Sequence, residues 1–401
     1  MLRVVIMSGS VGAGHDGAAE ELARRVRERG HEVVRLDLLD LVAWRIGWLV
    51  RRCYAAELAR VPRTWGWVLT TLQRHRWLAA LVGFLVYRLA APATQAALTP
   101  CPDLVVSVYP GASQLLGRMR SRGELDAPVV TFLTDMSVHP LWISPGVDLH
   151  LALHEVAAAQ AGEAGAETVR VGGAAVRPRF RPAYASVERA VVRSRLGIPA
   201  DRPAALITGG CWGLGDLLAT AADIAATGLA TPVVVCGTNT QLQAIVRARG
   251  LGVAVGWIDD LAPLMRACDV VVQNAGGLTS LEALACGVPV LSYRCLPGHG
   301  TSNAAALHEA GLAAWPTDLG ALRAALIKAL EGPPPAVPEL VLADPTELLV
   351  GVCPGTAAAA TRDRDVAPVP APREVDPVTP ATARDIDAAA AEAAGAAGVP
   401  A

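Results

Sequence analysis

The first residues able to do chemistry lie near the start of the chain. The run Gly12-Ala13-Gly14-His15-Asp16-Gly17 follows an apolar strand expected over Leu2–Met7 and leads into a helix expected over Asp16–Arg29. Glycines permit a tight strand-to-helix turn, and a histidine titrates in the range that suits a general base. The same run reads as G-x-G-x-x-G, and Asp37 closes the next strand, which is the pattern of a dinucleotide-binding loop. Against that interpretation, four residues separate the strand from the first glycine.

A second loop, Asn274–Gly277, offers an anion site. A strand expected over Val270–Gln273 ends at it, and a helix expected over Thr279–Ala285 follows. Glycines allow close backbone approach, and the helix N terminus presents amide donors to a diphosphate. In the first turn, Glu282 can accept hydrogen bonds from two neighbouring ribose hydroxyls. Alternatively, Glu282 completes a capping box with Thr279.

Other polar loops of the second half can surround the same ligand. A glycine-rich loop that contains Gly210 follows the strand expected over Ala204–Thr208, and Cys236–Asn239 and Gly256–Asp259 each end a further strand. The polar run Pro297–Asn303 precedes a helix expected over Asn303–Glu309. Together these loops predict a site for the base, ribose, diphosphate and sugar of one nucleotide-sugar.

Strands and helices alternate along both halves, which predicts an α/β fold with parallel sheets. Each half opens with a glycine loop, so we expect two Rossmann-like domains and a ligand cleft between them. The expected boundaries are residues 1–175, residues 176–331 and a Pro/Ala-rich tail over residues 332–401 that is largely disordered.

The segment over residues 44–92 has a different composition. It holds five of the chain's nine tryptophans and eight arginines against one acid, Glu57. Arginine and tryptophan on apolar helices suit the headgroup region of an anionic membrane. The alternative is a helical insertion that packs on the sheet. The longest uncharged apolar run, Trp77–Tyr87, is shorter than the ~20 residues of a bilayer span.

Overall composition excludes some classes. A net charge of −2 gives no reason to expect a nucleic-acid partner. None of the eight cysteines forms a C-x-x-C pair, which argues against zinc, and their scatter suits a reducing cytosol. We expect no signal peptide, because the sequence enters a strand at once.

The motifs of both halves resemble those of a known family. The second half resembles the family 28 glycosyltransferases, which have the GT-B fold and include the monogalactosyldiacylglycerol synthases. The first half resembles the diacylglycerol glycosyltransferases among them, through Gly12–His15, Pro102–Ser107, Thr134-Asp135, His139 and Trp142. The resemblance runs from about Leu2 to Leu330. It implies that the first half takes a lipid acceptor and the second half a UDP-sugar.

The resemblance also implies roles for individual residues. His15 and Asp135 are the expected catalytic residues, with His15 as the base. Expected acceptor-binding residues are Gly12, Gly14, His139 and Trp142. Expected donor-binding residues are Gly210, Gly237, Asn239, Ile258, Gly276, Gly277, Thr279, Glu282, His299 and Asn303. The chain departs from the family pattern at Asn274, His299 and Gly300, so the sugar is left open.

The expected function is transfer of a hexosyl group from a UDP-sugar to a diacylglycerol-like lipid with inversion. No cofactor or metal is expected, and the location would be the cytoplasmic face of the cell membrane. The alternatives are a relative that uses a non-lipid acceptor, a UDP-sugar epimerase, a binding protein without turnover, and an NAD-dependent oxidoreductase.

Overall fold

The computed structural model describes residues 1–10, 13–42, 46–52, 68, 71, 72, 74–182 and 186–353. Gly12, an expected acceptor-binding residue, and most of residues 53–73 of the tryptophan- and arginine-rich segment lie outside the described residues. The described residues all belong to one compact unit, Met1–Ala358.

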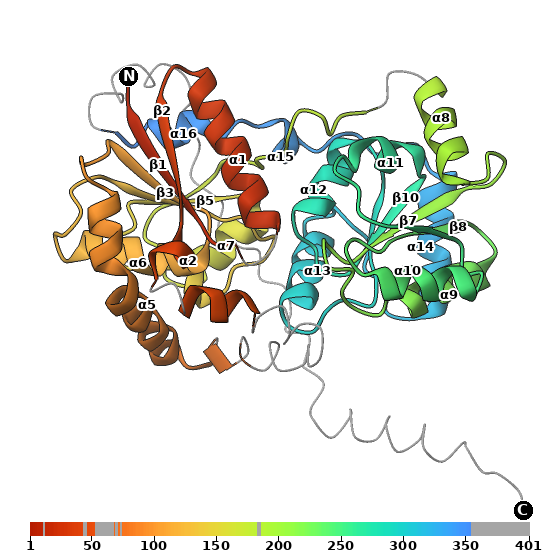
Figure 1. Cartoon of the computed structure of the whole chain (residues 1–401), viewed down its shortest axis with the longest axis horizontal. Coiled ribbons are helices and arrows are strands. Elements are labelled where there is room, and N and C mark those ends of the chain that lie inside the picture. The colour runs from red at the N-terminus through yellow and green to blue at the C-terminus, as the bar shows by residue number, and fades with distance from the viewer. Residues whose placement is uncertain are drawn as a thin grey trace, which may run out of the picture. The chain divides into compact units, whose positions relative to one another are not determined.

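The first half is built on a six-stranded parallel sheet with the order β2-β1-β3-β4-β5-β6 (Figure 1). Its strands are β1 (Arg3–Ser8), β2 (Glu32–Asp37), β3 (Leu104–Ser107), β4 (Val129–Phe132), β5 (Leu149–Ala152) and β6 (Val169–Val171). Its helices are α1 (Ala13–Glu28), α2 (Leu38–Leu41), α5 (Arg76–Ala97), α6 (Pro110–Ser121), the 3-10 turn η1 (Pro140–Trp142) and α7 (Glu155–Glu163).

The second half has a five-stranded parallel sheet with the order β11-β10-β7-β8-β9. Its strands are β7 (Ala204–Thr208), β8 (Thr231–Val235), β9 (Val253–Val255), β10 (Val270–Gln273) and β11 (Val290–Ser292). The helices are α8 (Ser186–Leu196), α9 (Leu217–Thr227), α10 (Thr240–Ala248), α11 (Ala262–Ala267), α12 (Leu278–Ala285), α13 (His299–Glu309), α14 (Leu319–Glu331), α15 (Glu339–Leu342) and α16 (Thr346–Val350).

The alternation of strand and helix follows from the sequence. Runs such as Val270–Gln273 and Leu104–Ser107 are buried along their whole length, as strands covered on both faces must be. Helix α1 carries Asp16 in its first turn and Arg25 and Arg27 in its last, so both ends complement the helix dipole. These features confirm the expected α/β fold.

The structure corrects the start of one expected helix and shows another helix that extends beyond its uncharged apolar run. Helix α13 begins at His299 instead of Asn303, because Gly298 takes a positive φ of 80° as the residue before the helix and the chain turns at once. Helix α5 is longer than the uncharged run Trp77–Tyr87. By length and composition, Trp77–Ala97 can cross a membrane, although 28% of its apolar window is buried.

Helix α5 packs its small residues inward and its large ones outward. Ala79, Ala90 and Thr94 are buried, and a side chain at Gly83 would overlap the amide of Gln114 on α6. The glycine therefore lets α5 and α6 approach closely. On the other face, Trp77 is 64% exposed, and Leu81, Phe84, Leu85 and Leu89 are each 45–51% exposed.

The last described segment returns to the first half. The backbone amide of Ala174 donates to Leu340 O on α15 at 2.7 Å, and Arg29 pairs with Asp344 at 2.8 Å. Asp344 also accepts from the amide and hydroxyl of Thr346 at the start of α16. Asp is a good capping residue and Pro suits the start of a helix, which explains why a short helix begins here.

An ion pair between a buried arginine and a partly exposed aspartate fixes α8 to the second sheet. Arg193 is 4% exposed, and its Nη2 donates to Asp269 Oδ2 at 2.7 Å. The same carboxylate oxygen accepts from the amide of Ala204 at the start of β7. Asp269 therefore links α8 to the start of β7.

We expect Asp269→Ala to lower the free energy of unfolding by about 3 kcal/mol, because it leaves the buried Arg193 guanidinium without its counter-charge. Urea denaturation followed by circular dichroism measures the change. Arg195→Ala, which removes an exposed arginine from the same helix, is the control. Equal, small losses in both variants would contradict this account of the ion pair.

Candidate functional site

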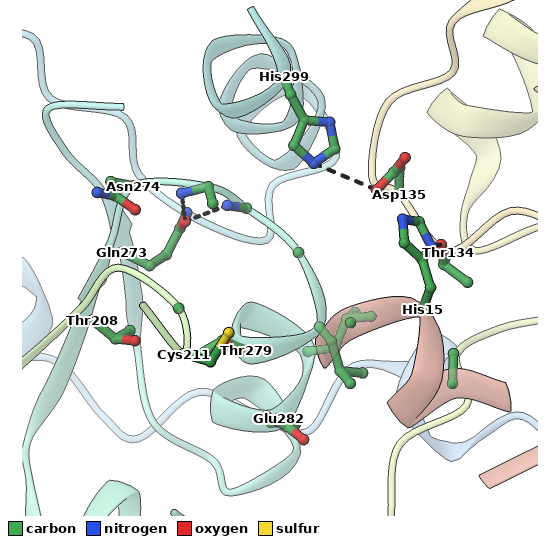
Figure 2. A pocket seen from close by; sticks show the side chains of 18 of the residues that line it. His15, Thr134, Asp135, Thr208, Cys211, Gln273, Asn274, Thr279, Glu282 and His299 are labelled. Atoms are coloured by element: carbon green, nitrogen blue, oxygen red, sulfur yellow. Dashed lines mark hydrogen bonds and ion pairs between the residues drawn. The ribbon is translucent and has the colours of Figure 1, made fainter. Parts of the chain in front are cut away.

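A buried glutamine fixes the backbone conformation of the loop between β10 and α12. Gln273 Oε1 accepts hydrogen bonds from the amides of Ala275 and Gly276, and its Nε2 donates to Ser292 Oγ at 2.6 Å. Gly276 has a φ of 69°, and a side chain there would overlap Asn303. The loop therefore needs glycine at this position, and Figure 2 shows Gln273 bound to its backbone. Sequence reasoning did not single out Gln273.

The start of α12 is free to bind an anion. Gly277 precedes the helix and provides no side-chain cap, so no side chain occupies the first amides of α12, although the amide of Ser280 donates to Gly277 O. The alternative prediction of a capping box between Thr279 and Glu282 is wrong. The helix already begins at Leu278, so Glu282 is its fifth residue, whereas a capping box needs the glutamate at the third. The side-chain Nδ2 of Asn274 donates to Leu214 O at 2.8 Å, which ties this loop to the glycine-rich loop after β7.

These loops line a cavity of about 280 Å³, here called the glycine-loop cavity. It opens between the two halves and is also lined by Gly14, His15 and Asp135 of the first half. Of the expected donor-binding residues, those that line it are Gly210, Gly276, Gly277, Thr279, Glu282 and His299.

His15 enters this cavity from α1 with its tautomer set by its neighbours. Its Nδ1 lies 3.0 Å from Val108 O and 2.9 Å from Thr134 Oγ1. A carbonyl can only accept, so Nδ1 carries the proton and Nε2 has the free lone pair. Nε2 has no hydrogen-bond partner in the described part of the chain. Burial lowers the pKa of His15 below 6.5, against the opposing charge of Asp135, so the ring is neutral and able to accept a proton near pH 7.

Asp135 lies at the centre of a cluster of aromatic and imidazole rings. Trp142 Nε1 donates to its Oδ2 at 2.9 Å, and His299 Nε2 lies 3.6 Å from its Oδ1. Burial alone would raise the pKa of Asp135, but the nearby His299, His15 and His139 and the Trp142 hydrogen bond hold it below its usual value. Figure 2 shows His299 and Asp135 reaching toward each other from opposite halves, beside His15.

A second cavity, of about 430 Å³, meets the first at these residues. His15, Asp135 and His299 line both. The rest of the second cavity, here called the apolar cavity, is mostly hydrocarbon and is formed by α2, residues 46–50, α5 and the start of α6. The three polar residues therefore lie where a ligand from the glycine loops and an apolar ligand can touch.

Several expected site residues lie elsewhere. Trp142 is fully buried and lines neither cavity; it touches the site through its hydrogen bond to Asp135 and its ring contact with His15, 6.0 Å between ring centres. His139 lines the apolar cavity. Burial lowers the pKa of His139 to about 4. Asn239 caps α10 by accepting from the amide of Leu242, and Gly237 packs against Cys211 O. Ile258 packs partly buried on the core.

Asn303 joins the two halves. Its Oδ1 accepts from the amide and hydroxyl of Ser137 at 2.9 and 2.8 Å, and its Nδ2 donates to Ala275 O at 3.0 Å. The side chain is completely buried. Its contacts hold the loop after β4 against the loop after β10, on either side of the glycine-loop cavity.

The G-x-G-x-x-G pattern has a packing explanation. A side chain at Gly17 would lie 2.8 Å from Leu278 Cδ2, so this glycine lets α1 approach α12 closely. Asp37 is already engaged, since it accepts from the amide of Leu39 and pairs with Arg51 at 3.0 Å. Both residues therefore have structural roles that need no dinucleotide.

Solved structures define the class of fold. Sucrose-phosphate synthase from Thermosynechococcus elongatus matches 83% of this chain and 90% of its own, with a TM-score of 0.54 and 15% identity. The SsfS6 glycosyltransferase of Streptomyces sp. SF2575 matches 87% and 99%, with a TM-score of 0.51 and 15% identity. The chain has the GT-B fold, as the sequence predicts.

Sequence comparisons narrow the resemblance. Residues 15–174 match the family model of monogalactosyldiacylglycerol (MGDG) synthase, and residues 205–332 match that of glycosyl transferases group 1. Monogalactosyldiacylglycerol synthase 1 of Arabidopsis thaliana is 27% identical over 332 residues, which cover 77% of this chain and 61% of that protein. The processive diacylglycerol beta-glucosyltransferase of Bacillus subtilis is 26% identical over 220 residues, covering 53% and 56%. The chain thus spans about three fifths of the length of these curated relatives.

The pKa of His15 can be measured without an activity assay. We expect its imidazole to titrate below pH 6.5 because it is buried, and Asp135→Asn to lower this pKa further by removing a negative charge. Proton NMR, with the signal assigned through His15→Gln, measures both values. The exposed Asp126→Asn is the control. A rise in the pKa of His15 in Asp135→Asn would contradict the arrangement.

Proposed function

We propose that the protein transfers a hexosyl group, with inversion, from a UDP-sugar to the hydroxyl of a diacylglycerol-like lipid. One observation carries the proposal: His15, Asp135 and His299 line both the glycine-loop cavity and the apolar cavity. A donor bound on the glycine loops and a lipid in the apolar cavity would meet at these side chains. The names of the curated relatives, a monogalactosyldiacylglycerol synthase and a diacylglycerol beta-glucosyltransferase, support a hexosyl group and a diacylglycerol acceptor.

The residues support a simple sequence of events. The acceptor hydroxyl attacks the anomeric carbon as the bond to the diphosphate breaks, and the leaving electron pair goes to UDP. His15 Nε2 takes the hydroxyl proton, and the charge of Asp135 stabilises the imidazolium that forms. The uncapped N terminus of α12 stabilises the charge that grows on the diphosphate. The protein would need no further cofactor for this.

The apolar cavity favours a lipid over a soluble acceptor. Ile46, Val50, Val82 and Leu89 line this cavity and are also 36–47% exposed, so the cavity opens onto the outer apolar surface of residues 46–50 and α5. A hydrocarbon chain can pass from a bilayer into the cavity without crossing water. An epimerase would have no use for such an opening.

We further propose peripheral attachment to an anionic membrane on the cytoplasmic side, and the same surface supports the attachment. The exposed face of α5 continues into Trp48, Leu49 and Val50, and the guanidinium of Arg52 lies over the Trp48 ring at 5.3 Å. The opposite face of α5 packs on α6 and the first sheet. The helix is therefore suited to lie in the headgroup region with one face in the protein.

Activity tests the proposal directly. We expect release of UDP from at least one member of a UDP-sugar panel, dependent on diacylglycerol in liposomes. His15→Ala should lower turnover by about 10²- to 10⁴-fold, because the proton acceptor is lost. The control is His308→Ala, at the far end of α13. Unchanged turnover in His15→Ala would remove this residue from the mechanism, and no UDP release with any donor would refute the proposed reaction.

Membrane attachment has its own test. Leu81 and Leu85 are exposed on α5 and line neither cavity, so Leu81→Asp/Leu85→Asp should abolish sedimentation with anionic liposomes and leave UDP binding intact. Val187→Asp/Val191→Asp is the matched control, since it places the same charges on an exposed apolar pair of α8. Equal sedimentation of both double variants would contradict attachment through α5.

A further inference from the structure

The carboxylate expected to bind ribose is held by an arginine that sequence reasoning did not identify. Arg177 Nη2 donates to Glu282 Oε1 at 2.7 Å. Glu282 is 5% exposed and lines the glycine-loop cavity, as does Arg177. Oε2 of Glu282 has no partner among the described residues. One oxygen is thus fixed by the arginine, and the other is free for a ligand.

Arg177 comes from the segment that joins the two halves, between β6 and α8. Arg25 on α1 donates to Val176 O at 2.8 Å, which fixes the backbone beside it. The Arg177 guanidinium lies 5.3 Å from the ring centre of the buried Phe180. These contacts place the planar guanidinium at the rim of the cavity, in a position that a flexible ammonium group would not hold as well.

Part of this guanidinium has no partner. Arg177 Nε is buried and makes no hydrogen bond with the described residues. Leaving a buried donor unpaired is costly, and such groups are normally satisfied by protein or ligand. The arginine is therefore incompletely satisfied when the cavity holds no ligand.

We propose that Arg177 is a positioning residue that orients Glu282 toward the two ribose hydroxyls of the donor nucleotide and so makes the site selective for ribo- over 2′-deoxyribonucleotides. This inference rests on the proposed function, since it concerns the same UDP-sugar. A carboxylate with one oxygen anchored presents the second in a fixed direction. A nucleotide without the 2′-hydroxyl would leave part of that buried carboxylate unpaired.

Arg177 also keeps Glu282 able to accept. Burial raises the pKa of Glu282, and the hydrogen bond and charge of Arg177 oppose that rise. Without Arg177, the pKa rises further, and the carboxyl is protonated as the pH falls toward it. The other charged or titratable groups near Glu282 are Arg179 on the same segment, Asp260 ahead of α11 and Cys286 at the end of α12. Across the adjoining groove, α1 presents Glu20, Glu21 and Arg24.

Calorimetric binding of UDP and 2′-deoxy-UDP between pH 6 and 8 tests the inference without turnover. We expect the unmodified protein to prefer UDP by about tenfold or more, the value of a hydrogen bond to a charged group. Arg177→Gln should weaken UDP about tenfold and 2′-deoxy-UDP little, so that the preference is lost. UDP binding to this variant should also weaken from pH 8 to pH 6, whereas binding to the unmodified protein should change less.

Two further variants separate positioning from folding. Arg177→Lys, which keeps the charge but not the planar donor, should restore the weak pH dependence and only part of the affinity. Arg179→Gln removes the neighbouring arginine, whose side chain lies 4.0 Å from Asp260, and should change UDP affinity less than about twofold. Combining Arg177→Gln with Glu282→Gln should add little to the loss from Glu282→Gln alone, because both act on one contact.

The outcomes are distinct. Equal weakening of UDP and 2′-deoxy-UDP in Arg177→Gln, or additive losses in the double variant, would overturn the positioning role and leave the proposed function standing. No preference for UDP in the unmodified protein would overturn ribose selectivity alone. Failure of the unmodified protein to bind either nucleotide would refute the proposed function and the inference together.

Discussion

The site depends on a buried carboxylate placed among imidazole and indole rings. Asp135 is 6% exposed, yet it accepts from Trp142 and faces His299 from the other half. A buried charge persists only when it is paired and hydrogen-bonded. This requirement explains why Trp142 is completely buried beside the cleft and why three histidines surround one acid. The same requirement brings α1, the loop after β4 and the start of α13 to one point.

From this point the two halves have different tasks. The second half offers a backbone surface: two glycine loops tied by Asn274, an uncapped helix N terminus, and a glutamate fixed from the connecting segment. The first half offers a neutral imidazole and an apolar cavity that opens on an apolar surface. A polar, charged ligand fits the first environment and a hydrocarbon fits the second. His15 is available to both because its Nδ1 is held by Val108 O and Thr134 Oγ1.

Local patterns carried much of the prediction. The parallel strands, the loop at Gly276-Gly277 and the position of His15 follow from apolar runs, glycines and spacing. The start of α13 does not follow from such patterns. It depends on a positive φ at Gly298, and the polar residues after this glycine are typical of a loop. Arg177 and Gln273 were missed for another reason. Arg177 lies 105 residues from Glu282, and only the fold shows that they meet. Gln273 ends an apolar strand, and the sequence does not show that its side chain turns back to bind the amides of the next loop. The roles proposed for His139, Trp142 and Asn303 remain predictions, and their contacts favour supporting positions for the last two.

The central claim is that lipid and donor meet at His15, Asp135 and His299. Photo-crosslinking with a diacylglycerol that carries a diazirine on its acyl chain, in vesicles and with UDP present, tests it most directly. Mass spectrometry should find adducts on the lining of the apolar cavity, at α2, residues 46–50, Val82–Leu89 and the start of α6. Adducts confined to the outer face of α5 or to the second half would contradict the account, because the lipid would then never reach His15.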